Sequence, residues 1–435
     1  MAMKYKPYPA YKDSGISWLG DVPAHWEVRR LKHNFRLLTQ KTDRRENPVA
    51  LENIQSWLGR FIPTETEFEG EGIAFERGDI LFGKLRPYLA KVFLAETAGE
   101  AVGDFFVMRP TSDVNGRFAL YQILNKDFIS IVDGSTFGAK MPRVNWEFMS
   151  GMVLVMPTKD EQSAIATFLD RETTKIDTLI AKQEHLIELL QEKRTALISH
   201  AVTKGLNPDA PMKDSGVEWL GGIPTGWNVI PIRALARQGA DSFIDGDWIE
   251  APFITDDGVR LIQTGNIGTG YYKEQGFRYI SDNTFRLLKC TEIEPGNILI
   301  CRLAEPVGRA CIAPDLGSRM ITSVDVCILK TKDNIDARFI VYLMSSQPYL
   351  GFMESQCRGG TRDRVSRSFL GSVRVVLPNK QEQVLISDFL DRETTKIDTL
   401  IQKSRHAIDL LKERRTALIS AAVTGKIDVR DGVNG

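Results

Sequence analysis

The sequence predicts an α/β (α+β) protein with two globular blocks separated by an antiparallel coiled coil of two long helices, the whole arranged as a pseudo-twofold internal repeat. Two repeated motifs carry this prediction. FLDRETTKIDTLI at 168–180 recurs unchanged at 389–401, and KDSGISWLG from Lys12 returns as KDSGVEWLG from Lys213. The segments between the motifs, roughly 29–156 and 230–377, share little sequence. One repeated frame therefore carries two different inserts.

The composition is that of a globular chain and excludes several classes of protein. The 435 residues are 43% hydrophobic and 26% charged, which excludes disordered and fibrous proteins. Lys plus Arg equals Asp plus Glu at 56 each, so any site for a polyanion must be local. Five cysteines, an odd number without a CxxC pair, argue against a disulfide framework or zinc site. Without an apolar segment long enough for a signal peptide or membrane span, we expect a cytoplasmic protein.

Each long repeat predicts one long helix. Residues 159–203 contain neither glycine nor proline, and their apolar residues recur every 3.5 to 3.6 positions, as they do in the second copy. Each helix would span on the order of 65 Å and needs a partner, for which the other copy is the obvious candidate. The first helix leads from block one to block two, and the second begins where block two ends, so the pair should be antiparallel. The predicted boundaries are 1–157, 158–204, 205–378, 379–425 and a tail, 426–435.

Polar residues at equivalent positions of the two helices have two interpretations. Gln183 and Ser404 are equivalent, as are Arg194 and Arg415. They either fix the register of the helix pair from within its seam or lie just outside it, and the sequence favours neither. The tryptophans of the short motif, Trp18 and Trp26 with their second-copy equivalents, are interpreted as structural anchors.

Short β-rich runs bounded by turn residues predict the strands of the blocks. They are GDILFGKL from Gly78, MVLVMP from Met152, GNILICRL from Gly296, DVCILK from Asp325 and VRVVLP from Val373. Both blocks end in such a strand and a proline, followed at once by the long helix.

The sequence contains none of the common catalytic motifs. It has no P-loop, no strand-linked GxGxxG, no HExxH, no GxSxG, no metal-spaced Cys/His cluster and no adenine-methyltransferase motif. Basic, glycine-containing loops are its distinctive local feature: GKLRPYLAK at 83–91, FGAKMPRV at 137–144 and CRGGTRDRVSR at 357–367. Such loops suit DNA, because glycine admits close backbone approach while Arg and Lys neutralise phosphate or bind guanine. They are equally compatible with ordinary solvated loops.

Four features together resemble the specificity (S) subunit of type I restriction-modification systems. They are the repeated motifs, GDILFGKLRPYLAK, the basic loop before each final strand and the LPNKQEQ entry to the last helix. The resemblance covers nearly the entire chain. It implies two target recognition domains, each reading one half of an asymmetric bipartite sequence in double-stranded DNA, with the helix pair setting the spacer. It also implies a non-catalytic chain that recruits two methyltransferase subunits and motor-nuclease subunits in a prokaryotic cytoplasm, without a membrane. S-adenosylmethionine, ATP and Mg would belong to those partners, and no cofactor to this chain.

The resemblance also implies positions of DNA contact. In the first block these are Lys84, Arg86, Tyr88, Lys140 and Arg143, and in the second Arg302, Arg309, Arg358, Thr361, Arg362 and Arg364. The second block departs from the family pattern, with CRLAEPVGRA in place of LRPYL, which weakens the assignment of Arg302 and Arg309. The outer faces of the helices, including Glu172, Lys175, Glu188 and Glu192, either dock the methyltransferase subunits or are simply solvated.

Two other classes of protein remain as alternatives. A hidden enzyme, such as a nuclease with scattered acidic ligands, is disfavoured because the repeat leaves no spare domain. A coiled-coil scaffold that binds only proteins has no need of two dissimilar domains with basic loops.

Overall fold

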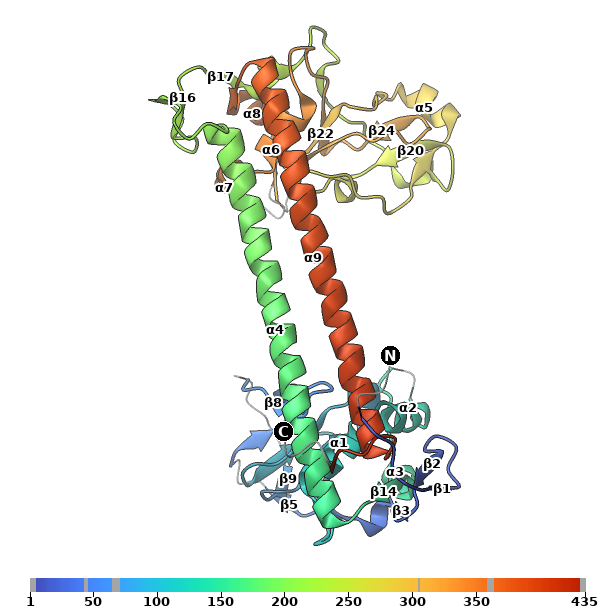
Figure 1. Cartoon of the computed structure of the whole chain (residues 1–435). Coiled ribbons are helices and arrows are strands. Elements are labelled where there is room, and N and C mark those ends of the chain that lie inside the picture. Colours follow the sequence, from blue (N-terminus) through green and yellow to red (C-terminus); the bar gives the residue numbers. More distant parts are fainter. Residues whose placement is uncertain are drawn as a thin grey trace. The chain divides into compact units, whose positions relative to one another are not determined.

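The computed structural model describes residues 5–42, 46–64, 71–138, 140–303, 306–357 and 364–430. The chain divides into two compact units: unit 1 is Met1–Glu184 with Arg405–Gly435, and unit 2 is His185–Ser404. Each unit contains one insert and a part of each long helix, α4 (Lys159–Lys204) and α9 (Lys380–Val423) (Figure 1). Among the described residues, no helix combines the length and apolar character that a membrane span requires.

Unit 1 contains two four-stranded sheets and three two-stranded pairs. The first sheet has the order β11-β10-β13-β4: Val92–Leu94, Ile80–Gly83, Phe105–Pro110 and Phe35–Leu38. The second has the order β5-β9-β12-β6: Lys41–Thr42, Gly72–Phe75, Gly99–Val102 and Pro48–Val49. The paired strands are β1 (Tyr11–Asp13) with β2 (Asp21–Pro23), β3 (Glu27–Arg30) with β14 (Val153–Met156), and β7 (Ile54–Gln55) with β8 (Arg60–Phe61). The shorter helices are α1 (Gly116–Ile123), α2 (Lys126–Gly134) and α3 (Trp146–Gly151).

Unit 2 also contains two four-stranded sheets, together with two two-stranded pairs. Its first sheet has the order β18-β25-β22-β23: Phe243–Asp245, Val326–Leu329, Ile298–Cys301 and Ala310–Ile312. The second has the order β19-β21-β20-β24: Ile254–Thr255, Tyr279–Ile280, Val259–Ile262 and Met320–Thr322. The pairs are β15 (Met212–Asp214) with β16 (Gly222–Pro224), and β17 (Asn228–Pro231) with β26 (Arg374–Leu377). The shorter helices are α5 (Asp282–Leu288), α6 (Ala337–Met344), α7 (Gln347–Ser355) and α8 (Arg367–Ser372).

The first sheets of the two inserts share strand order and register although the insert sequences differ, whereas the second sheets pair their strands in different orders. In unit 1, β10 is antiparallel to β13 with Ile80 opposite Met108, and in unit 2, β22 is antiparallel to β25 with Ile298 opposite Leu329. One parallel pair also occurs in each second sheet, β6 with β12 and β20 with β24. The structural repeat therefore runs through the inserts as well as through the frame.

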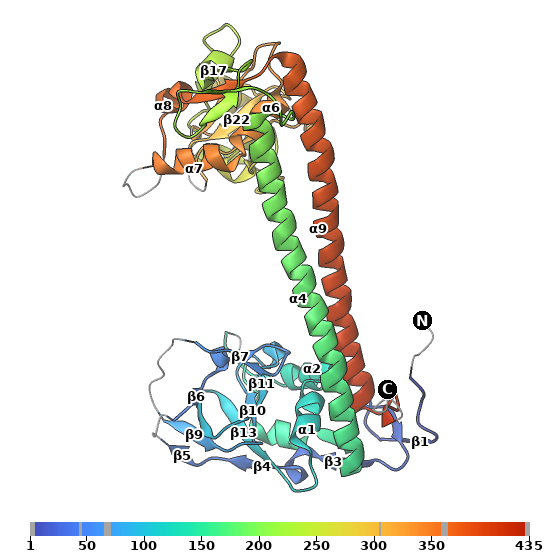
Figure 2. The same cartoon turned by 60° about the vertical axis from the view of Figure 1, so that its left-hand side comes forward.

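Each first sheet packs against a short helix of the same insert. Helix α1 packs on β11, and α6 packs on β23. Figure 2 shows α1 lying between the strands of unit 1 and the first part of α4. The strand predictions are confirmed, because β10, β14, β22, β25 and β26 occupy the five predicted runs. The motif tryptophans are structural as expected: Trp26 and Trp227 are completely buried in their units' cores.

The two long helices pack alongside each other in opposite directions within each unit. In unit 1, Phe168 and Leu169 of α4 share a core with Ala422 and Val423 of α9. In unit 2, the last turns of α4 and the first turns of α9 do the same, through Val202 and Leu390 among others. The mixed α/β fold with an antiparallel pair of long helices is therefore confirmed.

Candidate nucleic-acid interface

The five predicted residues of the first block lie on two loops that the backbone holds together. The Arg86 amide donates to the Pro142 carbonyl at 2.8 Å, and the Val144 amide donates to the Lys84 carbonyl at 3.1 Å. Leu85 and Arg143 also form a β-bridge. We call the side chains of these loops the first basic surface, which consists of Lys84, Arg86, Tyr88, Lys140 and Arg143. All are exposed except Lys84, which is half-buried.

The first basic surface combines cations with exposed apolar side chains. Arg86 is exposed and has a left-handed backbone, with φ of 50°, which is uncommon outside glycine. Phe137 and Met141, on the second loop, are also exposed. Cations suited to phosphate lie here beside apolar groups suited to base edges, which is the composition of a DNA-contacting surface.

Asp104 neutralises part of this surface. Its carboxylate accepts from Arg143 Nη2 at 2.7 Å and from Arg143 Nε at 3.2 Å, and it lies 3.7 Å from Lys84 Nζ. Sequence reasoning missed this residue, because it precedes β13 and is remote in sequence from both loops. The only available signal was its alignment with Asp325 at the offset of 221 that relates the helix motifs.

The second block repeats this geometry with different residues. Arg364 Nη2 lies 2.9 Å from Asp325 Oδ1, and Arg364 forms a β-bridge with Leu303. The Arg302 amide donates to the Asp325 carbonyl at 2.8 Å, as the Lys84 amide donates to the Asp104 carbonyl at 2.9 Å. Arg364 thus occupies the place of Arg143. Arg358, Thr361 and Arg362 lie outside the described residues.

Arg302 and Arg309 are placed differently from what contact with DNA requires. The Arg302 guanidinium is buried and lies 3.0 Å from Asp245, with further bonds to the Val365 and Val324 carbonyls. Arg309 is also buried and donates to four backbone carbonyls, those of Thr264, Ile267, Leu303 and Pro306. Both side chains therefore hold loops in place, and their positions do not support the prediction that they contact DNA.

The glutamine of the EQ motif attaches each long helix to its block. Gln162 Oε1 accepts from the Asn115 amide at 2.7 Å, and its Nε2 donates to the Asp113 and Pro157 carbonyls. Gln383 makes the equivalent bonds to the Asp336 amide and to the Asn334 and Pro378 carbonyls. Both side chains are buried, so the motif fixes the angle at which the helix leaves the block.

The repeated helix motif holds the block a second time. Asp170 accepts from Arg117 and Tyr121 of α1 at 2.7 Å each, and Asp391 accepts from Arg338 at 2.7 Å and from Tyr342 at 2.6 Å. Burial, together with the neighbouring carboxylate, raises the pKa of Tyr121 to about 12, and the same causes act on Tyr342. These tyrosines are therefore hydrogen-bond donors at all physiological pH values.

A reciprocal pair of salt bridges joins the two long helices. Arg415 Nε lies 3.0 Å from Asp177, and Arg194 Nε lies 3.0 Å from Asp398. Only the first pair is covered: the Arg415 and Asp177 side chains are 9% and 11% exposed, against 34% and 49% for Arg194 and Asp398. In unit 1 the β7–β8 hairpin covers the pair, since Arg415 donates to the Trp57 carbonyl. Arg415 and Arg194 thus connect the helices, which favours the register-fixing interpretation.

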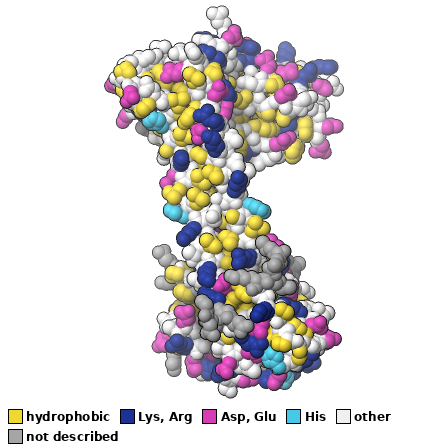
Figure 3. Space-filling view, in the orientation of Figure 1, with side chains coloured by type: hydrophobic (Ala, Val, Ile, Leu, Met, Phe, Trp, Pro, Cys, Tyr) yellow, Lys and Arg dark blue, Asp and Glu magenta, His cyan; other side chains and the backbone are white. Residues whose placement is uncertain are grey.

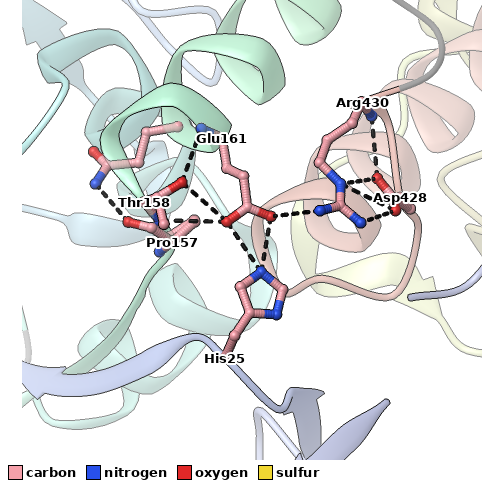
Figure 4. Close-up of polar contacts among 7 residues, drawn as sticks. His25, Pro157, Thr158, Glu161, Asp428 and Arg430 are labelled. Carbon is pink, nitrogen blue, oxygen red and sulfur yellow. Dashed lines mark hydrogen bonds and ion pairs between the residues drawn. The ribbon is translucent and has the colours of Figure 1, made fainter. Parts of the chain in front are cut away.

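A polar network at the start of α4 ties the tail of the chain to unit 1 (Figure 4). His25 Nε2 lies 2.9 Å from Glu161, and Arg430 Nη1 lies 3.6 Å from the same carboxylate. Arg430 also pairs with Asp428. In unit 2 the equivalent Glu382 accepts instead from the Trp227 indole at 2.9 Å. The structure therefore gives His25 an anchoring role.

The outer faces of the long helices carry hydrophobic side chains among charged ones (Figure 3). The exposed leucines of the two long helices are Leu179, Leu186, Leu189, Leu385, Leu400 and Leu410. Of the four charged candidates for docking, Glu172 is buried, contrary to the expectation of an outer-face position, and pairs with Lys175 at 2.9 Å. Glu188 pairs with His185 at 3.3 Å. Glu192 is exposed. Across the described ranges, no cluster of three His, Cys, Asp or Glu residues is arranged to hold a metal ion.

Comparison with known proteins agrees with this architecture. The family model of the type I restriction modification DNA specificity domain matches residues 253–409. The type I restriction enzyme MjaVIII specificity subunit of Methanocaldococcus jannaschii is 20% identical and covers 94% of this chain and 95% of its own. The putative MjaX specificity subunit of that organism is 23% identical over 95% of this chain and 96% of its own.

Solved structures show the same fold. A chain from a study of complex assembly and conformational transition of the type I R-M system matches with a TM-score of 0.68 at 17% identity, covering 92% of this chain and 98% of that one. The HsdS subunit of Thermoanaerobacter tengcongensis matches with a TM-score of 0.57 at 16% identity, covering 93% and 98%. The chain is therefore similar, over nearly its whole length, to the specificity subunits of type I restriction-modification systems.

Proposed function

We propose that this chain selects the DNA sequence on which a type I restriction-modification complex acts. Each insert would read one half of an asymmetric bipartite target, and the paired helices would set the spacer between the halves. The observation that carries the proposal is a pair of inserts whose first sheets share strand order and register but whose loops differ in chemistry. A protein that reads two unlike half-sites needs this combination, whereas a scaffold does not.

The first basic surface would bind the backbone of one half-site. Arg86 and Lys140 are exposed, and their positive charges are available to phosphate, while Tyr88 and Phe137 offer apolar area to the groove. The net charge of the chain is zero, so attraction to DNA must come from such local surfaces. Half-sites about one helical turn apart, roughly 34 Å, would present both major grooves on one face of the duplex.

Chemistry in the complex would belong to partner subunits. Two methyltransferase subunits would use S-adenosylmethionine, and motor-nuclease subunits would use ATP and Mg, in the cytoplasm of a prokaryotic cell. Methylation requires the target base to leave the stack, so this chain would hold the duplex firmly beside the partner's active site. The exposed leucines of the long helices, such as Leu186 and Leu189, supply apolar area for docking those partners.

A salt-dependence experiment tests the proposal. The double variant Arg86→Ala/Lys140→Ala should bind sheared genomic duplex DNA more weakly and lower the slope of log affinity against log salt by about two, because each phosphate that a cation neutralises adds roughly 0.9 to that slope. Lys213→Ala removes an exposed cation outside both loops and serves as the control. Unchanged affinity and slope in the double variant would remove the DNA-contact role of the first basic surface and favour a protein scaffold.

A further inference from the structure

We infer that Asp104 and Asp325 are positioning residues that aim one arginine of each insert at DNA, Asp104 acting on Arg143 and Asp325 on Arg364. The inference rests on the proposed function, because it assigns a role within DNA recognition. Neither aspartate lies in a basic loop, and each immediately precedes a central strand of its first sheet, β13 or β25.

Two inserts of different sequence build the same arrangement of an aspartate, a neighbouring strand and an arginine. In each insert the aspartate carbonyl accepts from the residue after the neighbouring strand, Lys84 after β10 or Arg302 after β22. The next residue, Leu85 or Leu303, pairs with the arginine in a β-bridge. The carboxylate then meets the guanidinium at 2.7 Å in the first insert and at 2.9 Å in the second.

Each arginine keeps guanidinium N–H donors for a further ligand. A guanidinium has five N–H groups in a rigid plane, so a carboxylate on one edge fixes the direction of the others. Asp104 takes Nε and Nη2 of Arg143, and Nη1 has no protein acceptor within the described part of the chain. Both arginine side chains are almost half exposed, at 46% and 47%.

A contribution to stability alone does not account for the Asp104–Arg143 and Asp325–Arg364 ion pairs. Ion pairs this exposed contribute on the order of 0–1 kcal/mol. The buried Asp79 illustrates the contrasting structural case, because its carboxylate binds Arg109 through two bonds of 2.8 Å and also accepts from the Glu76 amide. Asp104 and Asp325 are about one quarter exposed, and their arginines lie at the edge of the loops that the proposed function places on DNA.

The two inserts differ in one respect that predicts unequal effects. Asp104 lies near two cations, Arg143 and Lys84, whereas in the second insert Arg302 turns inward to Asp245 and leaves Asp325 with Arg364. Removing the Asp104 carboxylate therefore frees two side chains, and removing that of Asp325 frees one. We expect the larger loss of selectivity from the first change.

The test is sequence selection by the full chain, copurified with a coexpressed methyltransferase subunit, from duplexes that contain a random 30-base-pair segment of roughly three helical turns. Asp104→Asn should relax base preference in one half-site and lower affinity for the selected duplex about tenfold, leaving the other half-site unchanged. Asp325→Asn should do the converse with a smaller loss. Asp113→Asn and Asp282→Asn break exposed ion pairs elsewhere in the same inserts and are the matched controls.

Three outcomes would overturn the inference. Selection of the same sequences by wild type and both variants would overturn the positioning role while leaving the proposed function intact. Losses at both half-sites together with a lowered melting temperature would show a purely structural role and overturn it too. If the wild-type complex selects no sequence, the proposed function fails and this inference fails with it. Partial recovery of selectivity in Asp104→Glu, which keeps the charge, would support positioning.

Discussion

Asp177→Asn should destabilise unit 1 far more than the equivalent Asp398→Asn destabilises unit 2, although both change the same residue of an identical motif. Asp177 accepts from Arg415 at 3.0 Å and from Arg60 at 2.7 Å. Its loss leaves the Arg415 guanidinium, only 9% exposed, with the Trp57 carbonyl and the new amide as its acceptors among the described residues.

The magnitude follows from burial. Removing one partner of a buried ion pair costs about 3–5 kcal/mol, and the remaining acceptors place Asp177→Asn near the lower end, at about 3 kcal/mol. The Arg194–Asp398 pair is one third to one half exposed, so Asp398→Asn should cost at most about 1 kcal/mol. For units of this size, 1 kcal/mol lowers the melting temperature by roughly 2–4 °C.

Scanning calorimetry of the full chain measures both effects. We expect Asp177→Asn to lower the melting temperature of the transition that contains unit 1 by about 6–12 °C, and Asp398→Asn to shift its own transition by no more than about 4 °C. Equal shifts in the two variants would refute the reasoning, because they would show that the cover provided by the β7–β8 hairpin has no energetic effect.

Three further predictions concern the frame and the core. Gln162→Leu, which leaves the Asn115 amide and two carbonyls unpaired, should lower the free energy of unfolding by about 2 kcal/mol in urea titration; a change below 0.5 kcal/mol would contradict the anchoring role. Burial, and secondarily Asp247, raises the pKa of the Cys290 thiol to about 11 from 9.0. The native state should therefore lose stability as pH rises from 9 through 11, and Ellman's reagent should reach Cys290 at pH 8 only after unfolding. Truncation after Gly425 removes the buried Ile427 and Val429 and should cost about 3–4 kcal/mol in unit 1 alone, visible as a lower melting temperature of its calorimetric transition.

The frame was predictable because its signals are local and repeated. The absence of glycine and proline over 159–203 and the helical spacing of apolar residues identified α4, which the structure places at Lys159–Lys204. Alternating and β-branched runs bounded by turn residues identified β10, β22 and β26. Motif conservation between the copies also pointed to Arg194 and Arg415, although only the structure shows that they bind Asp398 and Asp177 across the pair.

The candidate site was less predictable because it depends on pairings distant in sequence. In the sequence alone, nothing distinguishes Arg302 and Arg309 from solvent-exposed cations. In the fold, both donate to backbone carbonyls, and Arg302 also lies 3.0 Å from Asp245. The first basic surface was predicted as a set, yet its organiser, Asp104, lies outside both loops. A residue type in a loop indicates what chemistry is available, whereas exposure and partners depend on contacts that sequence spacing does not reveal.

The topology of the inserts was also beyond sequence reasoning. The two blocks share little sequence, so the common strand order of their first sheets and the matching registers of Ile80 with Met108 and Ile298 with Leu329 appear only in the structure. Apolar side chains of the right size satisfy a buried strand in many combinations, which lets the sequence diverge while the sheet remains. The proposed function depends on this divergence, since loops that read different bases sit on one scaffold.

Methylation mapping tests the central claim most directly. The genomic DNA of cells that coexpress this chain with its methyltransferase subunit would be compared with DNA from cells that express the methyltransferase alone. We predict a new asymmetric, bipartite motif with methylated adenine in both halves, present only with this chain. If a purified, stable complex of the two proteins produces no such motif, the claim that this chain determines DNA sequence specificity is contradicted.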